Sequence, residues 1–376
     1  MDPIQLFVPH FRIDETLEQI RECLEKGWTG IGYKTVEFEK EWMSYTGHSN
    51  ALFLNSATAA LHLAIESFQI SESWSADSEV ISTGLTFIST NHAILYCGLK
   101  PVFADIDKYG CMDPKSLLEK IGPKTKAVIF VGLGGSTGQL KKISEICKNR
   151  NLRLIIDAAH MSGTRFVDDK LSNYGDAICY SFQAVKNLPT ADSGALSFRD
   201  DLISQIARKL SWLGISKDTY ARANKGNYSW NYDVEYTGYK YNGNAVMAAM
   251  ALVALKYLED DNEVRRTNFD LYKSYVKEHD ELSFVPIPDD CISSRHLVQI
   301  LVKDREGLLN HLNADQIFPG VHYRDNTEYK MYIDSSGSRP VTQAFSNGVI
   351  SLPNYIGLSP EAIRRVSSSV NSFYGK

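Results

Sequence analysis

The feature that most constrains the fold of this chain is a repeated alternation between short, continuous apolar runs and stretches with helical spacing. The apolar runs occupy residues 51–54, 79–82, 101–104, 127–131 and 152–156. Strands that are apolar on both faces are typical of a mostly parallel sheet with helices on each side. The sequence therefore predicts an α/β fold built around such a sheet.

Helices are expected before the first run and between the later ones. Leu17, Ile20 and Leu24 repeat at helical spacing, which predicts an amphipathic helix over 13–27. Further helices are expected over 58–68, 89–97 and 139–150. The sheet and its helices thus account for most of the first two thirds of the chain.

The alternation fades after about residue 250, and a smaller C-terminal domain is expected there. A strand-like segment at 296–302 and a final helix at 360–374 are the clearest elements of that region. We divide the chain into a large α/β domain over 1–254 and a small α+β domain over 255–376.

Composition excludes several classes of protein. The net charge of -5 gives no basic footprint for nucleic acid. The six cysteines lie far apart with no metal-ligand spacing, which predicts free thiols and no metal site. No apolar run approaches the roughly 18 residues needed to cross a bilayer, and the N-terminus lacks the pattern of a signal peptide. We expect a cytoplasmic protein with no membrane partner.

Polar residues that follow the apolar runs are the candidate site, because ligands bind beyond the carboxyl ends of parallel strands. Asn55-Ser-Ala-Thr58 is either a helix cap or a phosphate-binding turn. Asp157 is either a cap or the partner of a cationic ligand, such as a protonated pyridine nitrogen. His160 can bind the ligand or satisfy only a local hydrogen bond.

Lys186 follows the strand-like segment 179–182 at the same predicted edge of the sheet. Lysines usually lie in solvent, but one at the end of an apolar segment can lose its charge by desolvation and act as an amine nucleophile. A rival interpretation uses Gly134-Gly-Ser-Thr-Gly138, which matches the G-x-S-x-G nucleophile elbow of hydrolases, with Asp157 and His322 as further members of a triad. That pattern is short, and glycine and serine are common in any turn between a strand and a helix.

Taken in order, the strand-end motifs resemble those of the DegT/DnrJ-type sugar aminotransferases, a branch of the fold-type-I pyridoxal-phosphate (PLP) enzymes. The resemblance runs almost end to end. The segments that carry it are Gly27-Trp-Thr-Gly-Ile-Gly32, Ser56-Ala-Thr-Ala-Ala-Leu-His-Leu-Ala64, Thr86-Phe87, Pro101-Val-Phe-Ala-Asp-Ile-Asp107, Asp157-Ala-Ala-His160, Ser181-Phe-Gln-Ala-Val-Lys-Asn187, Gly238-Tyr-Lys-Tyr-Asn242, Gly320-Val-His-Tyr323 and Ser351-Leu-Pro353. The resemblance implies a large, mostly parallel sheet of the seven-stranded type.

The resemblance also implies a role for each motif. Lys186 would form a Schiff base with PLP and move protons at the reacting carbon, and Asp157 would pair with the pyridine nitrogen. His160 would lie by the phenolic oxygen, and Phe87 would stack on the ring. The other residues implied at the cofactor are Ser56, Ala57, Thr58, Ser181 and Gln183, with Lys240 and Asn242 reaching in from the partner subunit of a homodimer; Thr29, His322 and Tyr323 would line the sugar side.

The implied reaction moves an amino group, expected to come from glutamate, to a keto group of a nucleotide-linked deoxy sugar. Its setting would be the biosynthesis of cell-surface polysaccharide or natural-product sugars. The chain departs from the family pattern at Ala57, Gln183 and the turn Thr190-Ala-Asp-Ser-Gly194, and these departures bear on the identity of the sugar more than on the cofactor. Three rival functions share the fold: a sugar dehydratase, as in relatives in which histidine replaces the lysine, an amino-acid transaminase, and a non-catalytic regulator. Because Lys186 and Asp157 are both present, transamination is favoured.

Overall fold

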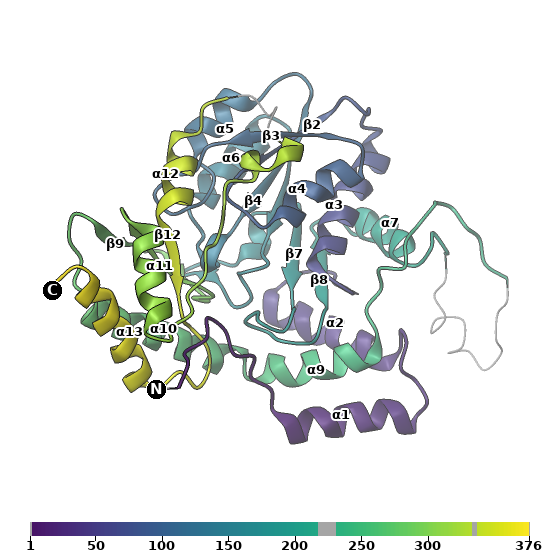
Figure 1. The fold of residues 1–376 in the computed structure, drawn as a ribbon. Helices are drawn as coiled ribbons and strands as arrows, with labels where there is room; N and C mark the ends of the chain where they lie inside the picture. The colour runs from purple at the N-terminus through teal and green to yellow at the C-terminus, as the bar shows by residue number, and fades with distance from the viewer. Residues whose placement is uncertain (1, 217–230, 333–336, 376) are drawn as a thin grey trace.

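The computed structural model describes residues 2–216, 231–332 and 337–375, which form a large α/β part and a smaller C-terminal part (Figure 1). The large part is built on a seven-stranded sheet with the order β1-β8-β7-β5-β4-β2-β3. In that order the strands are Leu52–Leu54, Gly194–Phe198, Ala177–Ser181, Arg153–Asp157, Thr125–Val131, Glu79–Thr83 and Lys100–Ala104. β8 runs antiparallel to both its neighbours, and the strands from β7 to β3 are parallel. The predicted sheet class is confirmed.

Successive side chains of each strand point to opposite faces of this sheet, and both faces are apolar. Helices therefore cover the sheet on each side. Val128 and Phe130 of β4 enter one core, whereas Ala127 and Ile129 enter the other. The first core is covered by α2 (Tyr33–Thr46), α5 (Pro114–Lys120), α6 (Leu140–Asn149) and α9 (Ala245–Lys256). The second is covered by α3 (Ala57–Glu72), α4 (Ile88–Tyr96) and α7 (Asp201–Ser211).

The predicted helix over 13–27 is present as α1 (Ile13–Glu25), but of the predicted stripe only Ile20 packs on the core of its own chain, whereas Leu17 and Leu24 do not. Ile13, Leu17 and Leu24 are more than half exposed, and Thr16 and Cys23 are buried instead. Cys23 packs with Ala245 and Ala249 of α9. Within the chain, α1 is therefore held by Thr16, Cys23 and the partly buried Ile20, while Ile13, Leu17 and Leu24 remain uncovered.

The C-terminal part has its own core, formed by a three-stranded antiparallel sheet and helices packed on it. Its strands are β9 (Leu282–Phe284), β11 (Val298–Val302) and β12 (Val349–Leu352), and its helices are α10 (Leu258–Tyr275), α11 (Arg305–Ala314), α12 (Pro340–Gly348) and α13 (Pro360–Phe373). A two-stranded ladder joins it to the large part, through β6 (Arg165–Phe166) and β10 (Cys291–Ile292). We keep the division at residue 254 as a proposal.

The first residues of the chain pack on this C-terminal part. Ile4 pairs with Ile317, with one hydrogen bond from the Ile4 N–H to Gln316 and another from the Phe318 N–H to Ile4, both 2.9 Å long. Ile4 belongs to the C-terminal apolar core, and Figure 1 shows both termini on that side of the molecule. Residue 4 thus contributes to the core of the C-terminal part, although it lies in the range 1–254 assigned to the large domain.

No helix in the part of the chain that the structure describes is long and apolar enough to cross a membrane. The cysteines are free, and all but Cys97 are buried.

Candidate active site

A cavity of about 420 Å³ opens at the carboxyl edge of the large sheet. Its walls include residues at or after the carboxyl ends of β1, β2, β5 and β7. This is the edge at which ligands bind in parallel sheets. The predicted site residues that line it are Ser56, Ala57, Thr58, Phe87, Asp157, His160, Ser181, Gln183, Lys186, His322 and Tyr323. The structure therefore brings together most of the residues selected from sequence.

The amino terminus of α3 forms one wall and has the features of an anion site. Ser56 is the N-cap residue, and its hydroxyl accepts a hydrogen bond from the Ala59 N–H at 3.1 Å. Within the described residues, the N–H groups of Ala57 and Thr58 make no hydrogen bond. Free N–H groups at a helix N-terminus bind phosphate well, because they point at the ligand and the helix dipole favours negative charge.

Gly194 at the start of β8 allows this turn to lie against the sheet. A Cβ atom at this position would lie 2.6 Å from the Tyr180 carbonyl oxygen and 2.8 Å from the Ala57 nitrogen. Real Cβ atoms do not approach backbone atoms so closely, so any side chain here would displace the turn that holds Ala57.

Asp157 lies buried at the end of β5, with an exposure of 5%. The Thr90 hydroxyl donates to one of its oxygens at 2.7 Å, and the Ala159 N–H donates to the other at 3.1 Å. Burial raises the pKa of Asp157, although the hydrogen bond from Thr90 opposes that change. No cation lies within ion-pair distance of the carboxylate among the described residues. The carboxylate is thus shaped to receive a cationic ligand.

Lys186 lies in a turn beyond β7, and hydrogen bonds within residues 183–186 fix the shape of that turn. The Lys186 N–H donates to the Gln183 carbonyl at 2.8 Å, and the Gln183 side chain accepts from the Val185 N–H at 3.2 Å. Desolvation lowers the pKa of the Lys186 amine to about 8, with the Asp157 charge opposing it. The amine makes no hydrogen bond within the described residues. It is a lysine that can be neutral near physiological pH, as a nucleophile or base must be.

His160 is held in one tautomer. Its Nδ1 accepts a hydrogen bond from the Gly134 N–H at 3.2 Å, so in the neutral ring Nε2 carries the hydrogen and faces the Tyr323 hydroxyl, also at 3.2 Å. Burial holds the pKa of His160 well below its ordinary value, so the ring is neutral. His322 lies beside it, with Nδ1 2.9 Å from the Ser351 hydroxyl and a pKa lowered to about 4 by burial.

Three predicted residues do not line the cavity of their own chain. Thr29 lies before α2, where its carbonyl accepts a hydrogen bond from the Ala245 N–H at 3.1 Å. The Lys240 amine lies 3.1 Å from the centre of the Trp212 ring, and Asn242 pairs with Leu54 at the end of β1. Thr29 is therefore separated from His322 and Tyr323, because the turn that holds it packs on α9.

The hydrolase interpretation does not fit this geometry. Ser136 is 2% exposed, and its hydroxyl accepts a hydrogen bond from the Gly138 N–H at 3.1 Å. Ser136 is not among the residues of the cavity, whereas an elbow serine must be exposed to substrate.

Two contributing residues were missed by the sequence analysis. Thr90 supports Asp157 and is itself 2.8 Å from the Thr86 hydroxyl. Thr86 lies in the bend before α4 and Thr90 lies in its first turn, and no local pattern in the sequence indicated this contact. His296 lies against His160 with ring centres 4.4 Å apart. It comes from the C-terminal part, and no local pattern indicated it.

Comparison with known proteins identifies the family. The sequence profile of the DegT/DnrJ/EryC1/StrS aminotransferase family matches residues 12–371. The chain belongs to this family. This aminotransferase is 32% identical over 368 residues to the spore coat polysaccharide biosynthesis protein SpsC of Bacillus subtilis (strain 168), covering 95% of this chain and 93% of SpsC.

Solved structures agree with that assignment. Helicobacter pylori PseC, an aminotransferase involved in the biosynthesis of pseudoaminic acid, has a TM-score of 0.91 and 25% identity, with 99% of each chain covered. Spr1654 from Streptococcus pneumoniae in its PMP form has a TM-score of 0.90 and 26% identity, with 98% of each chain covered. Its PLP form is also similar, with a TM-score of 0.87. The chain is thus a PLP-dependent sugar aminotransferase, which requires a sugar substrate and an amino donor.

The cavity of this aminotransferase fits the cofactor. PLP carries a phosphate, an aldehyde and a pyridine nitrogen that is cationic when protonated. The cavity offers free N–H groups at Ala57 and Thr58, an amine without a hydrogen-bond partner among the described residues, and a buried carboxylate at Asp157. Each of these groups has a matching group on the cofactor.

The lowered pKa of Lys186 predicts how uptake of PLP by the apoprotein depends on pH. Only the neutral amine can attack the aldehyde, and below its pKa the neutral fraction falls about tenfold per pH unit. We therefore expect the uptake rate to rise from pH 6, bend near pH 8 and level off above it. Stopped-flow absorbance of the bound cofactor measures this rate. A bend near pH 10.5, the ordinary value for lysine, would contradict a desolvated amine.

Proposed function

We propose that this aminotransferase moves an amino group from glutamate to the keto carbon of a nucleotide-linked deoxy sugar, in the biosynthesis of a cell-surface polysaccharide or a natural-product sugar. The observation that carries the proposal is the pairing of an amine of lowered pKa with a buried carboxylate in one cavity of a sugar aminotransferase. SpsC acts in spore coat polysaccharide biosynthesis and PseC in pseudoaminic acid biosynthesis, and both favour this setting.

The cofactor roles proposed for the cavity residues follow their places. Lys186 bonds the cofactor, Asp157 keeps the pyridine nitrogen protonated, and His160 lies by the phenolic oxygen. Phe87, which is 58% exposed, has a face available for the ring. Ser56, Ala57, Thr58 and Ser181 hold the phosphate, and Gln183 supports the lysine turn. When bound, the cofactor carries the amino group between the two substrates, and its ring withdraws the electron pair left at the reacting carbon.

Lys186 performs the proton transfers in this proposal. With the amino donor bound, the neutral amine of Lys186 would remove the proton from the donor's α-carbon and return it at the carbon that receives the amino group. It carries out the reverse transfer when the keto sugar has entered. A base with a pKa near the working pH suits both directions, because it must accept and release a proton in each cycle.

The sugar side of the cavity is assigned to His322 and Tyr323. Burial holds His322 neutral, and the Tyr323 hydroxyl is held by His160. Uncharged hydrogen-bonding groups suit a sugar, which offers hydroxyls rather than charges.

The substrate class is tested in single turnover with the enzyme in its pyridoxamine form. A keto sugar nucleotide should react faster than the same keto sugar without its nucleotide, since remote contacts hold the keto carbon in place. Simple keto acids other than 2-oxoglutarate, the product of the donor, serve as the comparison. A faster reaction with one of those keto acids would identify an amino-acid transaminase and overturn the sugar assignment.

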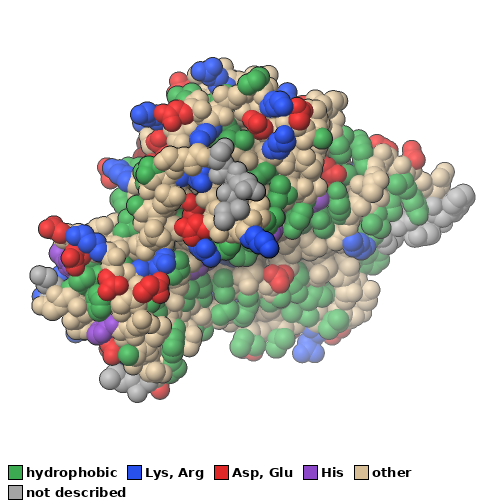
Figure 2. Space-filling model, turned by 45° about the horizontal axis from the view of Figure 1, so that its top comes forward, with side chains coloured by type: hydrophobic (Ala, Val, Ile, Leu, Met, Phe, Trp, Pro, Cys, Tyr) green, Lys and Arg blue, Asp and Glu red, His purple; other side chains and the backbone are tan. Residues whose placement is uncertain are grey.

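We also propose a homodimer with shared active sites. Among the described residues of the cavity, Lys186 is the only lysine or arginine, so this lining offers no second cation for the cofactor phosphate. Lys240 and Asn242 of the partner subunit would complete that site. The uncovered stripe Ile13, Leu17 and Leu24 of α1 is consistent with a subunit contact, and Figure 2 shows hydrophobic side chains gathered across the lower centre of the visible face.

Hybrid dimers test this arrangement. Lys186→Ala subunits are mixed with subunits that carry Lys240→Ala and Asn242→Ala, each of which is expected to be nearly inactive alone. Random exchange should restore about a quarter of the sites, because only one site of each hybrid combines an intact lysine with an intact partner loop. Activity is measured against the same subunits kept unmixed. A fully active monomer, or a mixture with no regained activity, would contradict shared sites.

A further inference from the structure

A buried polar network connects the lysine turn to the C-terminal part of the chain. Asn187, the residue after Lys186, is 2% exposed. Its side-chain amide donates to the Asn262 side-chain oxygen on α10 at 2.6 Å and to the Ser294 carbonyl at 2.8 Å. Both N–H groups of this amide are therefore engaged, which fixes the orientation of the side chain next to Lys186.

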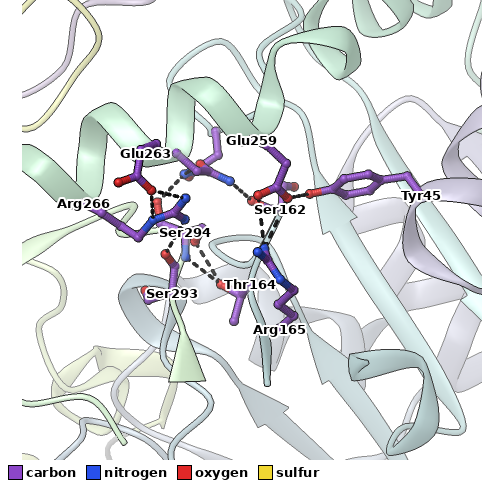
Figure 3. Close-up of polar contacts among 11 residues, drawn as sticks. Tyr45, Ser162, Thr164, Arg165, Glu259, Glu263, Arg266, Ser293 and Ser294 are labelled. Atoms are coloured by element: carbon purple, nitrogen blue, oxygen red, sulfur yellow. Dashed lines mark hydrogen bonds and ion pairs between the residues drawn. The ribbon is translucent and has the colours of Figure 1, made fainter. Parts of the chain in front are cut away.

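The same network reaches His160. The Asn262 amide donates to the Ser162 carbonyl at 3.0 Å, two residues after His160. The Ser294 hydroxyl donates to the carbonyl of His160 itself at 2.7 Å, and Thr164 holds Ser294 through the Ser294 N–H at 3.0 Å. Figure 3 shows Ser162, Thr164 and Ser294 close together below α10. Lys186 and His160, from two different strand ends, are thus anchored to the same pair of residues.

Two glycines leave the space that this network occupies. A Cβ atom at Gly163 would lie 2.1 Å from the Asn262 amide nitrogen, and one at Gly135 would lie 2.3 Å from the Ser294 hydroxyl. Gly163 also has φ +88°, a conformation that favours glycine. The backbone around the site therefore accommodates Asn262 and Ser294 in these positions.

Charged residues surround the network on its outer side. Arg165 pairs with Glu259 at 3.1 Å, and Arg266 pairs with Glu263 at 2.7 Å while donating to the Ser293 carbonyl at 3.3 Å. Figure 3 shows Glu259, Glu263 and Arg266 projecting from α10 towards these partners. Asn262 and Ser294 are both fully buried beneath them, where hydrogen bonds are stronger than in water.

We propose that Asn187, Asn262 and Ser294 are positioning residues for the amine of Lys186 and the ring of His160. None of the three contacts the transferred proton or the substrate. They fix the backbone beside Lys186 and the backbone of His160, and so hold the two side chains in one geometry. A displacement of about 1 Å at a reacting atom can cost about 100-fold in rate, so such an anchor has a measurable effect. The inference rests on the proposed role of Lys186.

The test compares two asparagines of α10. Asn262→Ala removes the anchor. Asn268→Ala is the matched control, because Asn268 is also buried and donates to Asn354 at 3.1 Å and to Tyr355 at 3.4 Å, outside the lysine network. For each purified variant the measurements are Tm, kcat and KM, and the pH-independent rate of PLP uptake by the apoprotein. That uptake rate reports the geometry of the neutral amine and does not require turnover.

Both variants are expected to lose similar thermal stability, but only Asn262→Ala should lower the plateau uptake rate and kcat, each by about 10-fold to 100-fold, with KM little changed. Equal uptake rates in the two variants would overturn the inference. Should Asn262→Ala not fold, Ser294→Ala removes only the hydroxyl that donates to His160. We then expect a shifted absorption maximum of bound cofactor and a lower kcat, and no change in either would overturn the inference. Borohydride labelling of the unaltered enzyme on a lysine other than Lys186 would instead overturn the proposed function.

Discussion

Replacing Lys186 by alanine is expected to reduce turnover by about 10⁴-fold or more, to below detection. In the proposed mechanism the variant loses both the covalent bond to the cofactor and the base that moves the proton, and general acid–base catalysis alone contributes up to about 10⁴-fold. The phosphate site proposed at Ser56, Ala57 and Thr58 does not depend on the lysine side chain, so the variant should still bind cofactor non-covalently. Steady-state assays and cofactor titration measure the two effects separately.

The location of the covalent bond provides the direct check. Reduction with borohydride followed by peptide mapping should place the label on Lys186 in the unaltered protein and nowhere in Lys186→Ala. Lys34→Ala is the matched control, because Lys34 is also buried but pairs with Glu22 and Glu37 outside the cavity. Ser136→Ala should likewise retain turnover. A severe loss in Ser136→Ala together with a mild one in Lys186→Ala would restore the hydrolase interpretation.

Asp157→Asn is expected to lower kcat by at least about 100-fold, the scale on which removal of one electrostatic partner acts in a water-excluded site. The carboxamide has nearly the same shape but cannot stabilise a protonated ring nitrogen, so the cofactor becomes a weaker electron acceptor. The fold should persist, because the carboxamide oxygen can still accept from the Ala159 N–H, while the Thr90 hydroxyl can rotate to accept from the new NH2 group. Single-turnover kinetics with the amino donor isolate the affected step.

Asp107→Asn is a suitable control for this variant. The pKa of Asp107 is also raised by burial, yet its oxygens accept hydrogen bonds from Gln139 and from the Tyr109 N–H rather than facing the cavity. The thermal stability of Asp107→Asn can change, but its kcat per folded molecule should not. Near-normal kcat in Asp157→Asn would mean that this carboxylate only caps the loop after β5.

Much of the large sheet could be predicted because its strands are buried on both faces and appear in the sequence as uninterrupted apolar runs. The placement of β8 between β7 and β1 could not, since antiparallel pairing depends on contacts with residues more than a hundred positions away, such as Leu52 with Leu196. The stripe of α1 illustrates the converse difficulty. Spacing identified an apolar face, but it cannot indicate whether the same chain or another one covers it.

Within the site, Asp157, His160 and Lys186 could be selected because each follows a strand, and parallel strands end at one edge. The supports of these residues could not be found in that way. Asn262 comes from α10 and Ser294 from the segment after β10. Their proposed role depends entirely on contacts with residues distant in the sequence, which no local pattern shows. Lys240 and Asn242 pose a different problem, because the site proposed for them belongs to a second molecule.

The pairing of Ile4 with Ile317 has a consequence for synthesis on the ribosome. The segment around Ile4 must wait until the more than 300 residues up to Ile317 have been made before its partner exists, which takes tens of seconds at about 5–20 residues per second. During that interval the large sheet can assemble, whereas Ile4 and its neighbours remain exposed. Pairing of Ile4 with Ile317 therefore follows synthesis of the whole large sheet, and a polar substitution at Ile4 would disturb that later step while leaving the nascent sheet intact.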